Sequence, residues 1–161
     1  MKPFLIIVSL LFVSLSWQRR PTEWCKIIPF QTTRAEVESM LGASISGTNY
    51  VLSYDTDNDR ITVWYGGAKA RADSECKWVM PEDMVLSFVY APKEKFPLTK
   101  LNVDLTKFRR EKAREMVNDF YYYNPAEGLT LTTRLVDGEE MLLSLERNPN
   151  EALRAKYCKK L

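Results

Sequence analysis

The chain has 161 residues, 45% of them hydrophobic and 12% aromatic, which is enough to bury the core of one domain. Its 23 basic residues nearly balance its 21 acidic ones, so charge gives no support for nucleic-acid binding. It contains no histidine, which excludes Ser–His and Cys–His catalytic pairs and histidine-ligated metals. We therefore expect no nucleic-acid partner, no cofactor and no metal.

Residues 1–16 have the pattern of a targeting segment. A lysine precedes Phe4–Leu15, which is apolar apart from two serines, and Ser14 and Ser16 have the spacing of a cleavage site. The run is shorter than the roughly 20 residues that a membrane-spanning helix needs. We predict a signal peptide at residues 1–16 and one domain at 17–161, exported to a periplasmic or extracellular location. The alternatives are an uncleaved anchor, which would be the sole membrane contact, and a buried segment of the domain.

The stretch Trp24–Gly42 predicts a short amphipathic helix around which a sheet could pack. Pro29 ends an extended run, because its ring lacks an N–H and restricts the residue before it. Thr32 or Thr33 can act as the N-cap, and Thr33 and Glu36 have the spacing of a capping box. One apolar stripe follows at helical spacing, formed by Val37, Met40 and Leu41. Gly42 stands where a helix-ending glycine belongs, and so short a helix needs tertiary packing to be stable.

The remaining chain is rich in strand patterns. We expect strands at 49–54, 60–65, 84–90, 119–123, 129–136 and 140–147. Asp137-Gly138 is the strongest hairpin turn in the chain. Residues 101–105 predict a short strand or turn, Phe108–Asn118 a mostly polar helix, and Glu151–Lys156 a final helical turn. The predicted fold class is α+β: a short N-terminal helix packed on an antiparallel sheet of five or six strands.

Three cysteines are present, and export would place them in an oxidising compartment where a disulfide persists. We favour a Cys76–Cys158 bridge between a central loop and the C-terminal tail. The competing pair is Cys25–Cys158, and Cys25 could instead be free. The odd number leaves one thiol for intermolecular pairing.

The run I-I-P-F-Q-T-T-R-A-E-V-E-S-M-L-G at 27–42, followed by I-T-V-W-Y-G-G at 61–67, resembles the start of a family of small exported bacterial proteins that is largely uncharacterised. The similarity continues in a cysteine loop with Cys76, in W-V-M-P at 78–81 and in the strand Val85–Tyr90. It covers most of the mature chain.

The similarity extends to the end of the chain. Three more segments carry it: P-K-E-K at 92–95, Y-Y-Y-N-P-A-E-G-L-T-L at 121–131 and the C-terminal Cys158. Ala43 stands where that family often has proline, and Cys25 is an additional cysteine. More distantly, the helix-then-hairpin start is similar to β-lactamase-inhibitor-like repeats and to the small lipoproteins of the β-barrel assembly machinery. Those are binding modules, so the resemblance implies binding and not catalysis.

Acidic residues offer the remaining routes to chemistry. Asp55, Asp57 and Asp59 imitate the first half of a calcium loop, but Arg60 replaces the glycine needed at its sixth position. A solvated hairpin turn is the simpler interpretation. A hydrolase that uses Asp55, Asp57 or Glu127 is one alternative function, and a small-ligand-binding protein is another.

We therefore expect a non-catalytic interaction module of the envelope or the extracellular space, with a protein or envelope component as partner and no catalytic residue. Its expected contact residues are aromatic, because aromatic side chains dominate binding hot spots: Trp64, Trp78, Tyr121, Tyr122 and Tyr123. Core packing within a strand is the competing explanation for the three tyrosines.

Overall fold

The structure, a computed structural model, describes residues 23–67 and 76–160, and these are mostly β-structure. The expected signal peptide at 1–16 lies outside the described residues. The ten strands are β1 Ser46–Thr48, β2 Val51–Asp55, β3 Asp59–Tyr65, β4 Cys76–Trp78, β5 Val85–Pro92, β6 Arg109–Lys112, β7 Asp119–Asn124, β8 Leu129–Val136, β9 Glu139–Arg147 and β10 Cys158–Lys160. The two α-helices are α1 Arg34–Leu41 and α2 Glu151–Tyr157. Eight of the strands form one sheet, so the α+β prediction of a helix on five or six strands was wrong.

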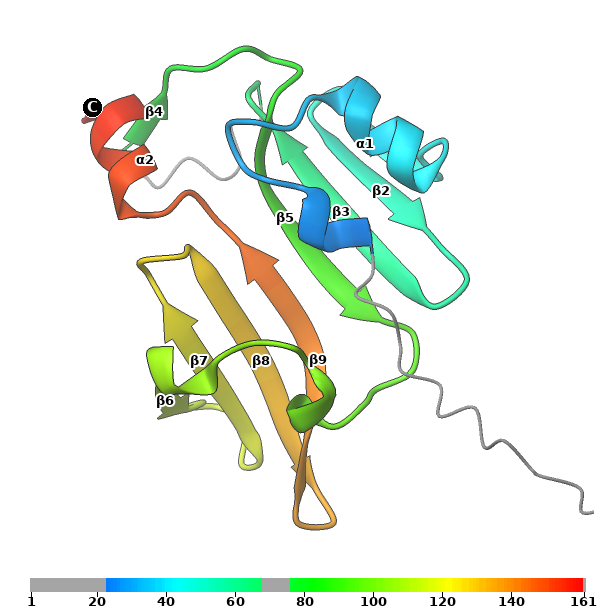
Figure 1. The fold of residues 1–161 in the computed structure, drawn as a ribbon, viewed down its shortest axis with the longest axis vertical. Helices are drawn as coiled ribbons and strands as arrows, with labels where there is room; N and C mark the ends of the chain where they lie inside the picture. Colours follow the sequence, from blue (N-terminus) through cyan, green and yellow to red (C-terminus); the bar gives the residue numbers. More distant parts are fainter. Residues whose placement is uncertain (1–22, 68–75, 161) are drawn as a thin grey trace, which may run out of the picture.

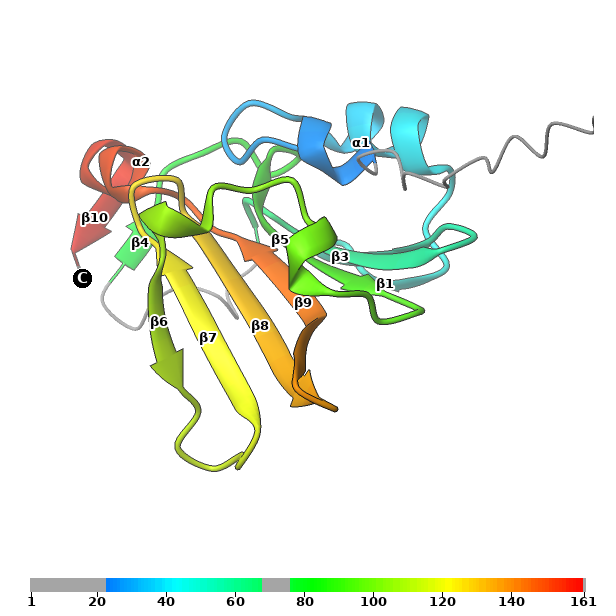
Figure 2. The same cartoon turned by 60° about the horizontal axis from the view of Figure 1, so that its bottom comes forward.

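The eight-stranded sheet is antiparallel throughout, in the order β1-β2-β3-β5-β9-β8-β7-β6 (Figures 1 and 2). Its first half comprises β1, β2, β3 and β5, and its second half comprises β6 to β9. Within this sheet, strand pairing joins the halves where β5 pairs with β9, through Phe88–Arg147, Val89–Glu146 and Tyr90–Leu145. We call this three-pair junction the seam.

One face of the sheet, here the inner face, carries α1 and the core. Alternate residues of β3 are buried, and Val37 of α1 joins them in one cluster with Phe88 of β5 and Leu145 of β9. The capping box is confirmed, since Thr33 accepts a hydrogen bond from the Glu36 amide and the Glu36 carboxylate accepts one from the Thr33 amide. Such a cap satisfies N–H groups that the first helical turn leaves unpaired.

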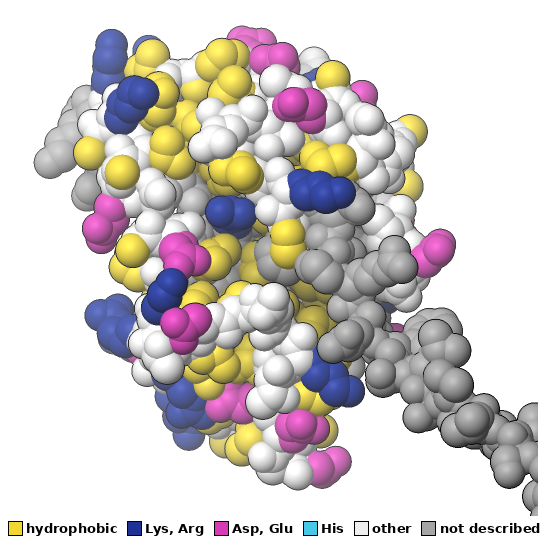
Figure 3. Space-filling view, in the orientation of Figure 1, with side chains coloured by type: hydrophobic (Ala, Val, Ile, Leu, Met, Phe, Trp, Pro, Cys, Tyr) yellow, Lys and Arg dark blue, Asp and Glu magenta, His cyan; other side chains and the backbone are white. Residues whose placement is uncertain are grey.

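The segment 93–108 crosses the inner face of the second half of the sheet (Figure 1). It contains two 3-10 helices, η3 Leu98–Lys100 and η4 Leu105–Lys107, and its apolar side chains pack against the core. Pro97 bridges to Met141 of β9, and the Leu142 amide donates to the Phe96 carbonyl at 2.8 Å. Figure 3 shows basic and acidic side chains interspersed over this side of the molecule.

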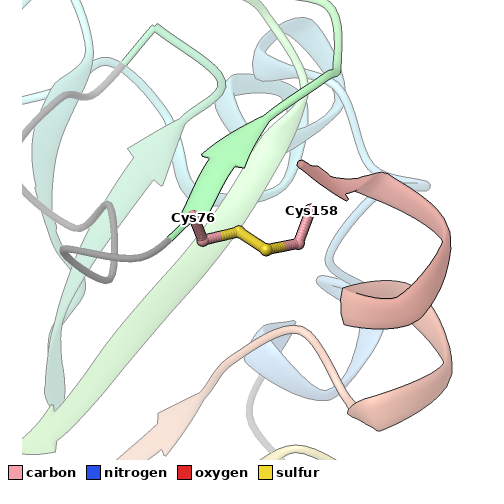
Figure 4. Close-up of a disulfide and its surroundings, with 2 residues drawn as sticks. All are labelled: Cys76 and Cys158. Atoms are coloured by element: carbon pink, nitrogen blue, oxygen red, sulfur yellow. A yellow bond between two sulfur atoms is a disulfide. The ribbon is translucent and has the colours of Figure 1, made fainter. Parts of the chain in front are cut away.

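The C-terminal end forms a separate small structure that we call the clasp: α2, β10 and β4. β10 pairs antiparallel with β4, and Cys76 and Cys158 form the predicted disulfide between them, with their Cα atoms 5.3 Å apart (Figure 4). Because β4 belongs to the first half of the chain and β10 follows the second half, the bridge links the two halves covalently. An oxidising, exported location is compatible with this bond.

The predicted strand at 129–136 coincides with β8, and both Asp137 and Gly138 have the positive φ angles that a tight hairpin turn requires. The helix expected at Phe108–Asn118 was wrong. Residues 109–112 form the edge strand β6 because they pair with β7, and pairing overrides their helix propensity. Across residues 23–67 and 76–160, no helix has the length and apolarity to span a membrane.

Candidate functional site

The face of the sheet opposite α1, here the outer face, carries a mixture of hydroxyl and aromatic side chains. Direct cross-strand partners point to the same face of a sheet. One row of partners therefore crosses all eight strands there: Ser46, Ser53, Thr62, Val89, Glu146, Thr130, Tyr123 and Arg109. The row is polar at both ends and half-buried in the middle.

Tyr121 and Tyr123 lie together on the outer face, two residues apart in β7. Their ring centroids are 6.0 Å apart, and each lies opposite a threonine of β8, Thr132 and Thr130 respectively. The guanidinium of Arg109 lies 5.9 Å from the Tyr123 ring centroid. Burial, with the charge of Glu111 nearby, raises the pKa of Tyr123, so its hydroxyl stays protonated and able to donate.

Tyr122 points to the inner face, as strand alternation requires. Its hydroxyl donates a 2.9 Å hydrogen bond to Glu140, so it belongs to the fold and is turned away from its two neighbours. Trp64 lies on the outer face, half-buried, because it shares the parity of Thr62 in β3. Three strands separate it from the tyrosines of β7. The structure thus brings together two of the five expected contact residues.

A hollow of about 480 Å³ opens beside Tyr123 at the end of the sheet nearest the clasp. We call it the clasp pocket. Its walls include Arg109, Tyr123 and Thr130 from the sheet, and Asn148, Glu151 and Arg154 from the chain around α2. It offers an aromatic ring, two hydroxyls, two guanidinium groups and one carboxylate. Its volume is in the range of pockets that hold small molecules or one or two side chains of a partner.

A second hollow of about 320 Å³ lies between the start of α1, the β1–β2 turn and the turn before β5, lined by Arg34, Tyr50 and Glu82 among others. Arg34 donates to the carbonyl of Asn49 and its guanidinium lies 4.7 Å from the Tyr65 ring centroid. None of the five expected contact residues lines this hollow.

Trp78 belongs to the clasp. Its ring lies 5.5 Å from that of Phe30, and Phe30 in turn stacks on Tyr157 of α2 at 4.8 Å. Phe30 has a φ of 61°, a conformation that costs a non-glycine residue about 1–2 kcal/mol and needs support from its surroundings. The stack supplies that support, and it holds the entry of α1 against the C-terminal helix.

The carboxylates of the alternative hydrolase do not form one site. Asp55 accepts from Arg60 at 2.9 Å and lies 3.1 Å from the Lys93 amine, and these hydrogen bonds hold its pKa below the usual range. Glu127 lies in the β7–β8 turn, 3.5 Å from Lys107, with β3, β5 and β9 among the strands between it and Asp55. Asp57 is exposed in the β2–β3 turn. Within the described residues no cluster of three or more metal-ligating side chains occurs.

Sequence reasoning missed Arg109, Thr130 and Arg154 as pocket residues. The alternation in L-T-L-T-T-R-L-V could have placed Thr130 opposite the buried Leu129 and Leu131. The sequence does not indicate Arg109 as a pocket residue, because its segment predicts a helix. It does not indicate Arg154 either, because Arg154 reaches the pocket through the fold of the clasp.

No protein-family model matches this chain, and comparisons with curated proteins and with solved structures give no match. The resemblance to small exported proteins and to binding modules therefore gains no support from these comparisons, and it stays a prediction.

Proposed function

We propose that this chain is a binding module that works outside the cytosol, without catalysing a reaction, and that takes a protein or envelope component on its outer face. The clasp pocket and the paired rings of Tyr121 and Tyr123 are the centre of that contact. Trp64 is a second, separate contact on the same face.

The observation that carries this proposal is the juxtaposition of Tyr121 and Tyr123 with hydroxyl groups beside a pocket. Tyrosine provides a large amphipathic surface at small entropic cost, and serine and threonine provide adaptable hydrogen bonds, which is the composition of many binding surfaces. Arginine beside an aromatic ring adds a group that is enriched in hot spots.

Two observations support work outside the cytosol. The Cys76–Cys158 bridge is of a kind that reducing compartments do not maintain, and residues 1–16 have the pattern of a signal peptide. A small-ligand-binding protein is the second candidate, favoured by the volume of the clasp pocket.

The test is site-specific crosslinking in producing cells. A photo-crosslinking amino acid at Thr132 lies next to Tyr121 but outside the pocket, and it should form one dominant adduct. Tyr123→Ala should reduce that adduct at least about tenfold, the effect of losing one hot-spot residue. Tyr50→Ala is the control, because it also truncates a tyrosine but beside the second hollow. It should leave the amount of adduct unchanged.

Equal adduct formation in Tyr123→Ala and Tyr50→Ala would contradict the proposed surface. Trp64→Ala tests the second contact on the outer face. If this variant forms as much adduct as the wild type, Trp64 is not a contact residue. Turnover of glycosidic or phosphate ester substrates by the mature protein, abolished by Asp55→Asn or Glu127→Gln, would support the hydrolase in place of the binding module.

A further inference from the structure

Helix α2 lies outside the buried core. It has seven residues and none of them is buried. A helix of this length does not persist in water on its own, because nucleation is costly and the few hydrogen bonds cannot offset it. Its position therefore depends on what holds its two ends.

The N-terminal end is tied to the sheet. The Asn148 amide donates to the Gly128 carbonyl at 2.7 Å, and Asn150 caps the helix by accepting from the Leu153 amide at 2.9 Å. The C-terminal end has several partners: Tyr157 accepts from the Val79 amide at 3.0 Å and stacks on Phe30, the Arg154 guanidinium lies 5.9 Å from the Trp78 ring centroid, and Cys158 carries the disulfide.

The same helix forms a wall of the clasp pocket through Glu151 and Arg154. We propose that the Cys76–Cys158 disulfide is a redox latch: in the oxidised state it seats α2 against the pocket, and its reduction releases α2 and β10 and opens the pocket wall. This inference rests on the proposed function, because it makes the state of the disulfide a regulator of the same binding site.

The reductant is a dithiol, such as a thioredoxin-type protein or a small-molecule equivalent. Its thiolate attacks the sulfur of Cys158, because Cys158 is a half-buried residue whereas Cys76 is only 1% exposed. The S–S bond breaks, Cys76 leaves as a thiolate and takes up a proton. The second thiol of the reductant then displaces Cys158, so two electrons and two protons reduce the bridge and the dithiol becomes a disulfide.

The effect should stay local because the clasp is not part of the main core. The buried cluster comes from Ile27, α1, η3 and the eight-stranded sheet, and it contains no residue of α2, β4 or β10. The strand pair β4–β10 is only three residues long. Without the bond, the strand pairing, the Val79–Tyr157 hydrogen bond, the Phe30–Tyr157 stack and the Arg154–Trp78 contact remain to hold α2 and β10, and all of them lie outside the buried cluster.

Hydrogen–deuterium exchange tests the latch directly. Cys25→Ser removes the free thiol and prevents disulfide exchange, and this variant is compared oxidised and after reduction with dithiothreitol. Protection in 151–160 and in 76–79 should fall at least about tenfold on reduction, while β3, β5 and β8 stay protected. Unchanged protection in 151–160 would overturn the latch, and so would loss of protection in every strand, since the bond would then hold the whole fold.

Two variants serve as controls for the chemistry. Cys25→Ser/Cys76→Ser/Cys158→Ser should behave like the reduced protein with or without dithiothreitol. Tyr157→Ala keeps the disulfide but loses the stack on Phe30, and it should show the smaller loss of protection of the two.

Crosslinking from Thr132 links the latch to binding. The triple-serine variant should form the adduct at least about fivefold more weakly or more strongly than Cys25→Ser, because two pocket residues leave their place. An equal adduct in both would remove the regulatory role and leave the proposed function standing. An adduct in neither would overturn the proposed function, while the exchange experiment would still decide whether the clasp opens.

Discussion

Arg110 of β6 donates a 2.7 Å hydrogen bond to Glu140 of β9, although β7 and β8 lie between their strands. The intervening strands contribute to the same network, since Tyr122 of β7 and Thr133 of β8 also donate to Glu140, at 2.9 and 2.8 Å. One residue from each of four neighbouring strands thus meets at a single carboxylate. This network fixes the edge strand β6, which buries no side chain of its own.

Glu140→Gln should destabilise the protein by about 1–2 kcal/mol, because three donors lose a charged acceptor and the geometry of an amide satisfies them only in part. The measurement is the free energy of unfolding from urea titration at pH 7. Glu139→Gln is the matched control, because Glu139 is the neighbouring residue and its side chain is exposed. It should change the free energy of unfolding by less than about 0.5 kcal/mol. Equal effects of the two substitutions would show that the network contributes no stability.

The same carboxylate predicts a pH dependence. Burial alone would raise the pKa of Glu140, but hydrogen bonds from Thr133, Arg110 and Tyr122 together hold it below its ordinary value. A carboxyl whose pKa is lower in the folded state stabilises the fold fully above the unfolded pKa of about 4.3 and loses that contribution as pH falls through the folded value. The stability difference between wild type and Glu140→Gln should therefore be full at pH 6–7 and shrink below about pH 4. A difference that stays constant from pH 7 to pH 3 would contradict this assignment.

Tyr54→Phe should cost about 1–2 kcal/mol of unfolding free energy. The hydroxyls of Tyr54 and Tyr65 share a 2.8 Å hydrogen bond inside the core, and both residues are fully buried, so the substitution leaves the Tyr65 hydroxyl without that partner. Tyr50→Phe removes a hydroxyl whose 3.5 Å contact with Glu82 is exposed, and it should be close to neutral. Urea unfolding compares the two, and a neutral Tyr54→Phe would refute the role of the buried pair.

Native protein should contain one reactive thiol, that of Cys25, and reduction under denaturing conditions should reveal three. Burial raises the pKa of Cys25, although the charge of Arg147 opposes the shift, so its reaction with Ellman's reagent should be slow near pH 7 and accelerate toward pH 9. Cys25→Ser should give no native signal. Three reactive thiols in the untreated native protein would contradict the bridge.

Several elements could be predicted because local signals and tertiary structure agree. Thr33 and Glu36 cap the helix that their spacing predicts, and 129–136 forms the strand that its pattern predicts, with Leu131 in the core. The Cys76–Cys158 pairing was the favoured one of the alternatives. In each case residues close in sequence, or cysteine chemistry, carry the information.

The fold class could not be predicted, because it depends on pairing between segments far apart in the chain. Arg109–Lys112 has helix-forming side chains, yet it becomes a strand because Phe120–Tyr123 offers it an edge. Ser46–Thr48 adds another strand through β2 alone. The clasp pocket depends on both kinds of long-range contact, since Arg109 reaches it through β6 and Arg154 through the disulfide-linked end of the chain.

The seam gives the molecule an unusual response to a broken backbone. The exposed residues Lys93–Lys95 begin the one stretch of main chain that connects the two halves of the sheet. A protease nick there would leave two fragments held by the seam, by the shared core, by the β4–β10 pairing and by one sulfur–sulfur bond. Such a nicked molecule would migrate as a single band on a non-reducing gel and separate into two bands once a thiol is added, so the covalent continuity of the protein does not depend on this loop.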